Sequence, residues 1–226
     1  MNKDPLILIL LGKSGAGKGT QLNLLRERLD LEFIGTGNLL RERKKIKDFT
    51  GKKIAEVIDN GGIIVTPIPF KLWMDSFEEI KNNKGNFNGL IIDGSPRKIK
   101  EAWLLEEALE WYEWDKRVKV ILIDISEEEA IARITRRKIC PGCSHIVMFS
   151  KDDTDIENCP QCGSKLIKRP EDTVEGIKKR LAWFEEEVGQ TIKYYEENNM
   201  LIRINGEQSV EDVYSDIIKA IEDDNN

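Results

Sequence analysis

A glycine-rich loop that directly follows a continuous apolar run constrains this chain more than any other feature. The run Leu6–Leu11 is all leucine and isoleucine, which is typical of a strand buried on both faces of a parallel sheet. The loop at 12–20 reads Gly-Lys-Ser-Gly-Ala-Gly-Lys-Gly-Thr and fits the pattern G-x-x-x-x-G-K, with a helical pattern after it. Backbone N–H groups of such a loop converge on phosphate oxygens, and the helix N-terminus adds partial positive charge. The sequence therefore predicts a phosphate-binding loop, although Gly19 stands where Ser or Thr is usual and Thr20 comes one position later.

Apolar runs and helical patterns alternate along the rest of the chain. Strands are predicted near Phe33 and at 90–93, 118–125 and 201–204, and helices at 20–29, 70–82, 99–111, 173–198 and 210–222, with one more from residue 127. This alternation predicts an α/β fold with a doubly wound, five-stranded parallel sheet. A polar helical stretch at 38–69 and a cysteine module at 138–171 interrupt it and are interpreted as insertions. The predicted core is then 1–37, 70–137 and 172–226, and Pro67 and Pro69 are expected to precede the helix at 70–82.

The charge balance and hydrophobicity exclude several classes of protein. Among 226 residues, 35 Lys and Arg face 41 Asp and Glu, a net charge of −6 that argues against a bulk nucleic-acid coat. No apolar run approaches the roughly 20 residues that span a bilayer, and Leu6–Leu11 is too short for the core of a signal peptide. We therefore expect a soluble cytoplasmic protein without membrane or nucleic-acid partners. No long interface helix is apparent, and a monomer is expected.

Four cysteines form two Cys-x-x-Cys pairs, Cys140 with Cys143 and Cys159 with Cys162, separated by fifteen residues. Each short pair aims two sulfurs at one point, so that four thiolates can bind one tetrahedral Zn²⁺. Two disulfides or four free thiols are the alternatives, and a reducing cytosol disfavours disulfides. A closed shell of four thiolates predicts a structural zinc. His145 could substitute as a ligand, but an exposed loop histidine is the preferred interpretation.

Charged residues gather at the predicted ends of strands and helices near the phosphate loop. Lys18 in the loop can reach the β- and γ-phosphates of a nucleotide. Asp93 ends a buried strand, where an acid can organise Mg²⁺ through water, or can simply cap the turn at Gly94. Six arginines suggest a cage for the charge of two phosphate groups: Arg41, Arg97, Arg133, Arg137, Arg169 and Arg180. Phosphoryl transfer depends on such positioning and neutralisation.

Several segments resemble the adenylate kinase family. They are 15–21 (Gly-Ala-Gly-Lys-Gly-Thr-Gln), 36–41 (Thr-Gly-Asn-Leu-Leu-Arg), 93–97 (Asp-Gly-Ser-Pro-Arg) and Arg133-x-x-x-Arg137. The cysteine module followed by Arg169 and Arg180 looks like the family's zinc-bearing lid. The motifs occur in the family's order along nearly the whole chain. The resemblance implies reversible transfer of the terminal phosphoryl group of ATP to a nucleoside monophosphate, with AMP favoured. It also implies a monophosphate-binding insertion at 38–69 and a zinc lid at 138–171.

The resemblance also implies a role for each matching residue. The implied catalytic residues are Lys18, Arg97, Arg137, Arg169 and Arg180. The implied ATP-binding residues are Gly15, Ala16, Gly17, Lys18, Gly19, Thr20, Arg133, Arg137, Ile146, Val147 and Gln208. The implied AMP-binding residues are Thr36, Arg41, Ile63, Ile64, Val65, Gly94, Ser95, Pro96, Arg97, Glu101, Arg169 and Arg180. The implied cofactors are structural zinc on the four cysteines and Mg²⁺ with ATP, and small-molecule nucleotides are the implied partners.

Five positions depart from the family's pattern, and all but the first lie near the acceptor side. Ser14 replaces Pro, Asn38 replaces Asp, Pro67 replaces Asp, Ser95 replaces Phe and Glu101 replaces Gln. An ionised Glu101 offers only hydrogen-bond acceptors, which suit the two donors of guanine better than adenine. A protonated Glu101 would imitate glutamine, and an acid in the first turn of a helix needs no ligand. AMP stays the favoured acceptor, with GMP or another monophosphate as the alternative.

Two further classes of protein compete with a kinase. A nucleotide-regulated switch could use the same loop, but the Asn/Thr-Lys-x-Asp segment of guanine-specific GTPases is absent from the sequence. A nucleic-acid-binding zinc ribbon could draw on Lys165, Lys168 and Arg169. Acidic residues in the same module would repel a phosphate backbone: Asp152, Asp153, Asp155 and Glu157. Both alternatives are therefore disfavoured.

Overall fold

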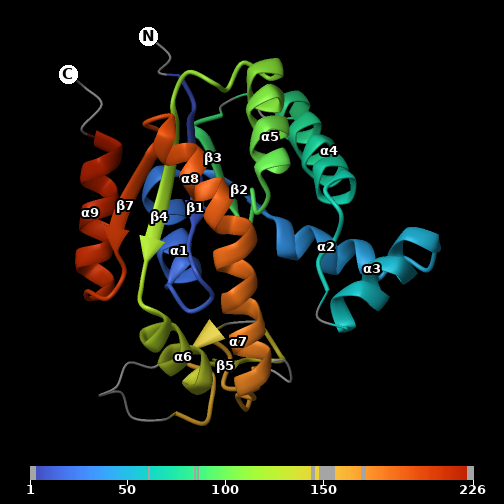
Figure 1. Ribbon diagram of the computed structural model, residues 1–226, viewed down its shortest axis with the longest axis vertical. Helices are drawn as coiled ribbons and strands as arrows, with labels where there is room; N and C mark the ends of the chain where they lie inside the picture. Colours follow the sequence, from blue (N-terminus) through green and yellow to red (C-terminus); the bar gives the residue numbers. More distant parts are fainter. Residues whose placement is uncertain are drawn as a thin grey trace.

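A five-stranded parallel sheet forms the centre of the computed structural model, which describes residues 4–60, 62–83, 85, 87–143, 146–147, 156–168 and 172–222. The strands are β1 (Leu6–Leu11), β2 (Glu32–Gly35), β3 (Gly89–Asp93), β4 (Val118–Asp124) and β7 (Leu201–Asn205). Their order is β2-β3-β1-β4-β7, and every pairing is parallel. All five carboxyl ends therefore lie at one edge of the sheet (Figure 1). The predicted α/β fold with a doubly wound sheet is confirmed.

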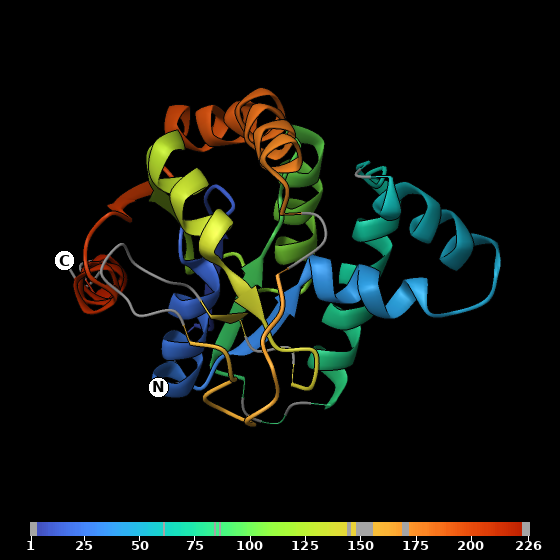
Figure 2. The same cartoon turned by 90° about the horizontal axis from the view of Figure 1, so that it is seen from below.

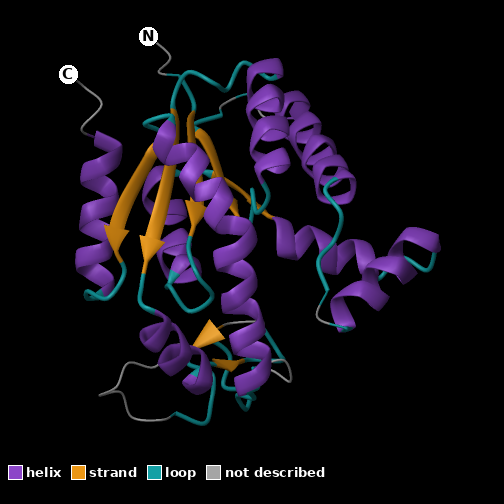
Figure 3. Cartoon of the chain, in the orientation of Figure 1, coloured by secondary structure: helices purple, strands orange, loops and turns teal. Residues whose placement is uncertain are grey.

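Alternate residues of the central strand face two separate cores. Leu6, Leu8 and Leu10 pack in a cluster with residues of α1 (Lys18–Leu29), α6 (Glu127–Arg136), α7 (Val174–Trp183) and α9 (Val210–Glu222). Ile7, Ile9 and Leu11 pack in a second cluster with α4 (Pro67–Asn83), α5 (Ile99–Trp111) and α8 (Gly189–Glu197). Helices thus cover both faces of the sheet (Figure 3). This arrangement explains why the strands read as continuous apolar runs rather than alternating ones.

Two parts of the chain extend beyond this sandwich. The short helices α2 (Thr36–Lys44) and α3 (Phe49–Asp59) project sideways next to α4 (Figure 1). The two-stranded ladder of β5 (Lys138–Ile139) and β6 (Ile146–Val147) lies with the cysteine module below the carboxyl ends of the strands. Figure 2, viewed from below, looks toward that edge. Both parts therefore flank the end of the sheet that carries the glycine-rich loop.

Two differences from the sequence prediction are larger than a shift of one or two residues at the end of an element. Pro67 and Pro69, expected before the helix, lie inside the first turn of α4. The first N–H groups of a helix have no partner within it, so prolines fit there, and Phe70 N–H is bonded to the Thr66 carbonyl. The helix predicted at 173–198 is interrupted by a π-helical turn, η1 (Phe184–Val188), between α7 and α8. Apolar spacing alone does not reveal a single inserted residue of this kind.

None of the helices that the structure describes is both long and apolar enough to cross a membrane.

Candidate active site

The glycine-rich loop joins β1 to α1 and leaves the start of that helix open. Gly17 is the N-cap of α1 with φ +90°, a conformation that favours glycine, and it provides no side-chain hydrogen bond to the first turn. In contrast, side chains of Asp48, Ser126 and Thr173 cap α3, α6 and α7. The N-terminus of α1 therefore presents uncapped N–H groups and a positive dipole end at the carboxyl edge of the sheet, which suits a phosphate.

Lys18 is folded back over the loop. Its Nζ donates to the Gly12 carbonyl at 2.6 Å and to the Lys13 carbonyl at 3.0 Å. Burial lowers the pKa of Lys18, the charge of Asp93 raises it, and the charges of Arg97 and Arg137 lower it further. The structure therefore brings one acid and three basic side chains, predicted from separate motifs, into a single electrostatic group beside the loop.

Asp93 ends β3 with a carboxylate oxygen that is unusually placed. Oδ1 is buried and has no hydrogen-bond partner among the described residues. A buried acceptor without a partner is costly unless water or an ion reaches it. The same carboxylate acts on Lys18 and on Arg97 through its charge. Its position fits water-mediated binding of Mg²⁺ next to nucleotide phosphates.

One buried carboxylate holds two of the predicted arginines. Asp172 accepts from Arg137 Nε at 2.9 Å and from Arg137 Nη2 at 2.7 Å, and from Arg180 Nη2 at 2.7 Å. The Asp172 side chain is 2% exposed. The two guanidinium groups are thus aligned by an acid that sequence reasoning missed, and its carboxylate offsets one of their two positive charges. No spacing rule marks it, because Arg137 and Asp172 lie 35 residues apart.

Arg133 connects the loop to the residue that follows β7, a strand at the side of the sheet. Its guanidinium contacts the Gly15 carbonyl at 3.5 Å and the Gly206 carbonyl at 3.0 Å, while Glu129 accepts from Nε at 2.6 Å. Arg133 therefore contacts the loop, Arg137 acts on Lys18 through its charge, and Arg180 shares Asp172 with Arg137. Arg169, the fifth predicted catalytic residue, lies outside the described residues.

The predicted acceptor side gathers around the end of β3. Arg97 donates from Nε to the Gly94 carbonyl at 2.8 Å. Burial lowers the pKa of Arg97, the charges of Glu101 and Asp93 raise it, and the charge of Arg41 lowers it. Arg41 itself bonds to Asn38 Oδ1. The two arginines predicted to bind the monophosphate, Arg41 and Arg97, are therefore close enough to act on each other through their charges.

Thr36 and Ser95, both predicted to contact AMP, point their hydroxyls at one another. The two oxygens are 2.7 Å apart, the indole N–H of Trp73 donates to Thr36 Oγ1 at 3.0 Å, and Ser95 Oγ donates to the Gly94 carbonyl at 2.8 Å. All three side chains are buried. In this structure their polar atoms bond to one another and to the backbone inside the protein and are not exposed to solvent. Of the other predicted residues, Ile63 and Ile64 are half-buried and Val65 is exposed.

Glu101 lies in the first turn of α5 and is 3% exposed. Its Oε2 accepts the Arg97 backbone N–H at 2.8 Å. Burial raises the pKa of Glu101, and the bond from Arg97 together with nearby positive charge lowers it. One carboxylate oxygen is therefore occupied by the backbone, as expected for an acid at a helix start.

The residues predicted for the ATP base lie away from this cluster in sequence. Ile146 and Val147 form β6, paired antiparallel with β5, and Ile146 is 40% exposed. The Gln208 amide donates to the Asn205 carbonyl at 3.0 Å and to Asp216 Oδ2 at 2.9 Å. Gln208 is thus oriented at the end of β7 by its own loop and by α9.

The four cysteine sulfurs converge within 4.8 Å of one another. The Cys140 and Cys162 sulfurs are 3.3 Å apart, the Cys143 and Cys159 sulfurs are 3.6 Å apart, and none of the four cysteines forms a disulfide. Sulfurs bound to one tetrahedral zinc would be about 3.8 Å apart, given Zn–S bonds of about 2.3 Å. Hydrogen bonding with Ser164 lowers the pKa of the Cys162 thiol to about 6, which favours the thiolate that a metal needs. The cluster can hold one metal ion, while His145 lies outside the described residues.

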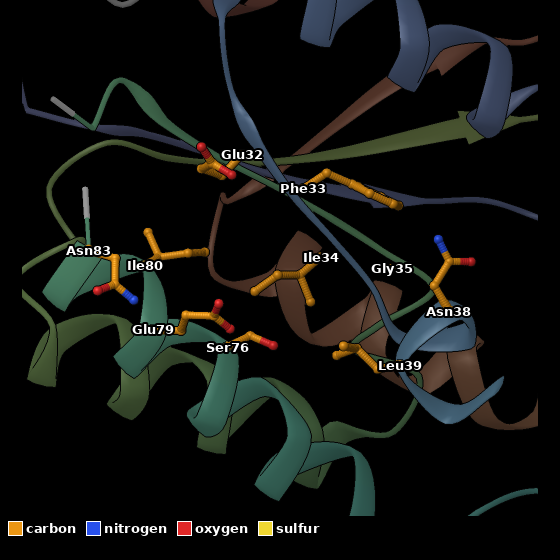
Figure 4. A pocket seen from close by; sticks show the side chains of 10 residues that line it. All are labelled: Glu32, Phe33, Ile34, Gly35, Asn38, Leu39, Ser76, Glu79, Ile80 and Asn83. Carbon is orange, nitrogen blue, oxygen red and sulfur yellow. The ribbon is translucent and has the colours of Figure 1, made fainter. Parts of the chain in front are cut away.

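A cavity of about 300 Å³ lies elsewhere, between β2 and the second half of α4 (Figure 4). Its lining includes Glu32, Ser76, Glu79 and Asn83, and contains none of the residues predicted to bind nucleotide. The glycine-rich loop and the arginines described above therefore do not line this cavity.

Together, the uncapped helix start, the folded-back lysine and the surrounding arginines define a P-loop nucleotide-binding protein equipped for phosphoryl transfer. Comparison with known proteins narrows this class. The adenylate kinase family model matches residues 10–200. The adenylate kinase of Chlamydia felis is 37% identical over 218 residues, covering 96% of this chain and 98% of that protein. That of Thermoanaerobacter pseudethanolicus is 34% identical over 220 residues, with the same coverage.

The chain belongs to the adenylate kinase family. It is accordingly a nucleoside monophosphate kinase, an enzyme that binds nucleotides and transfers a phosphoryl group between them, with Mg²⁺ accompanying ATP.

Proposed function

We propose that the protein catalyses reversible transfer of the γ-phosphoryl group of ATP to AMP, which yields two molecules of ADP. The observation that carries this proposal is the electrostatic group of Lys18, Asp93, Arg97 and Arg137. These side chains bring positive charge from three separate segments of the chain close to the loop, which supports a site where donor and acceptor phosphates would meet. We also propose that the enzyme acts as a cytoplasmic monomer that binds no nucleic acid.

Each residue in this proposal performs a positioning or charge-neutralising step. The loop 12–20 and Lys18 hold the donor phosphates, and Lys18 also orients the phosphoryl group that is transferred. Arg97 and Arg41 hold the acceptor phosphate. Arg133, Arg137, Arg169 and Arg180 neutralise the charge that develops between the two nucleotides. Mg²⁺, bound through water to Asp93, would neutralise the β- and γ-phosphate oxygens.

The projecting segments would exclude water during transfer. We propose that 38–69 closes on the monophosphate and 138–171 closes on ATP, with the core formed by 1–37, 70–137 and 172–226. Ile63, Ile64, Val65, Gly94, Ser95 and Pro96 would enclose AMP, while Ile146, Val147 and Gln208 would contact the adenine of ATP. Without water, the phosphoryl group passes to the acceptor instead of being hydrolysed. Initial rates of ADP formation from ATP with AMP, GMP, CMP, UMP and dAMP test the proposal, and the highest rate is expected with AMP.

Structural zinc in the cysteine cluster is part of the same proposal. The purified protein should contain about one zinc per chain, and removing it should lower Tm by at least about 5 °C. The metal would tie together two turns whose apolar core, among the described residues of the module, consists of Cys140, Cys159 and Leu166 with Val147 packed against them. Mass spectrometry measures the zinc content of the wild type. Calorimetry compares Tm of the wild type with Tm of the Cys143→Ser/Cys162→Ser variant. A Lys165→Ala variant, which changes an exposed side chain of the same module and keeps all four thiols and Ser164, is the control. Unchanged Tm in the metal-free double variant would refute a structural role.

GMP is the second candidate acceptor because Glu101 stands where the family has glutamine. If an ionised Glu101 carboxylate reads the base, Glu101→Gln should raise kcat/KM for AMP and lower it for GMP, by about tenfold each. The contact between Glu101 and the Arg97 backbone favours a smaller effect, since it explains the acid without a ligand. Steady-state kinetics with AMP and with GMP decide whether Glu101 reads the acceptor base. Parallel changes for AMP and GMP would show that Glu101 supports the loop and does not read the base.

A further inference from the structure

The loop that carries Arg97 holds its guanidinium group through one nitrogen, Nε. Its Nε bonds to the Gly94 carbonyl, and no hydrogen bond involves Nη1 or Nη2 within the part of the chain that the structure describes. The Cζ atom lies 5.7 Å from the centre of the Trp183 ring. The guanidinium therefore rests over an aromatic face, with its two terminal nitrogens available to a ligand.

Trp183 belongs to a continuous helical column, in which α7, η1 and α8 follow one another without a break. It is the last residue of α7, and the π-helical turn at Phe184–Val188 follows it directly. Further along the column, Thr191 donates its hydroxyl to the Arg97 carbonyl at 3.3 Å. The same column thus contacts both the side chain and the main chain of Arg97.

The column also carries a second arginine of the site. Arg180 lies three residues before Trp183, so that the two side chains lie on neighbouring positions of one helix face. Arg180 is held by Asp172, whereas Arg97 has no acid bonded to its terminal nitrogens among the described residues. An aromatic face can orient a guanidinium without neutralising it or occupying its donors. That leaves the donors on both terminal nitrogens for the phosphate.

We propose that Trp183 is a positioning residue for acceptor binding, because its indole holds the Arg97 guanidinium ready for the acceptor phosphate. The proposal rests on the proposed function, in which Arg97 meets that phosphate. Trp183 itself touches no substrate. Its contribution is a lower entropic loss when AMP binds, so it appears in KM for AMP and not in KM for ATP.

The test compares Trp183→Leu and Trp183→Met with Trp183→Phe, which keeps an aromatic face. The two aliphatic variants should raise KM for AMP by between about 2-fold and 30-fold, the range of a cation–π contact, with KM for ATP changed less than about 2-fold. Trp183→Phe should restore most of the affinity. Trp111→Leu, which removes a tryptophan that is 77% exposed on α5, is the matched control and should change neither constant.

A double-mutant cycle separates positioning from a general structural effect. In an Arg97→Met background, Trp183→Leu should have no further effect on KM for AMP. Equal fold-changes in both backgrounds, or an equal rise of KM for AMP and ATP, would overturn the proposal.

An NMR readout is independent of turnover. The Arg97 Nε–Hε order parameter should fall in Trp183→Leu and persist in Trp183→Phe, and unchanged values in both would also overturn the proposal. Absence of AMP-dependent turnover in the wild type would instead refute the proposed function, and the order parameters would still decide the role of Trp183.

Discussion

Replacing Lys18 with alanine is expected to lower kcat by about a hundredfold to a thousandfold while the protein stays folded. A group of this kind stabilises charge that develops only in the transition state, and losing one such donor has effects of this size in other enzymes. The structure supports the role, since Nζ lies at the Gly12 and Lys13 carbonyls, above the uncapped start of α1. Rapid-quench measurement of ADP formation separates the chemical step from nucleotide binding and product release.

Lys13 provides a matched control in the same loop. Its Nζ points away from the loop, to the Ile125 carbonyl at 3.1 Å and to Glu185 at 3.0 Å. Lys13→Met removes the same charge, yet it should lower kcat far less than Lys18→Ala. Near-wild-type kcat in Lys18→Ala, or equal losses in the two variants, would contradict a specific role for Lys18.

Replacing Asp172 with alanine is expected to reduce the free energy of unfolding by about 3 kcal/mol. Removing one partner from a buried ion pair leaves an uncompensated charge, and Asp172 is the 2% exposed acceptor for both Arg137 and Arg180. Because the Arg180 side chain is 32% exposed, most of the loss should come from Arg137, at 9%. Urea denaturation followed by circular dichroism measures the change.

Asp59→Ala is the control for this prediction. Its partner Lys44 lies 2.7 Å away, but the two side chains are 61% and 34% exposed, so the expected loss is below about 1 kcal/mol. Equal losses for Asp59→Ala and Asp172→Ala would contradict the importance of burial. Asp172→Ala should also lower kcat, since the two arginines lose their common anchor next to the proposed transfer site.

Local patterns in the sequence were sufficient for most of the fold. The helices predicted at 99–111 and 210–222 have the bounds found in α5 and α9, because caps and apolar spacing act within a few residues. The start of α4 differs from the prediction, because Pro67 and Pro69 indicate a helix boundary in the sequence whereas the first turn of a helix accepts proline. The π-helical turn was missed because it shifts the pattern by one residue without breaking it.

The site was predictable where a motif is contiguous and unpredictable where contacts cross the chain. The loop with Lys18 and the clustering of Arg97 with Arg41 follow from motifs that lie at strand ends. The bond of Thr36 to Ser95 spans 59 residues, and that of Trp73 to Thr36 spans 37. Sequence spacing carries no signal for such pairs, which form only when β2, β3 and α4 come together. The same holds for Trp183 and Arg97.

The central claim is that the phosphoryl group passes to a nucleotide acceptor and not to water. Phosphorus NMR of the wild-type enzyme with ATP, AMP and Mg²⁺ follows every phosphate in one sample. Two molecules of ADP should appear for each ATP and AMP consumed, without inorganic phosphate, and ADP alone should regenerate ATP and AMP. Release of inorganic phosphate at the same rate with and without AMP would contradict the claim.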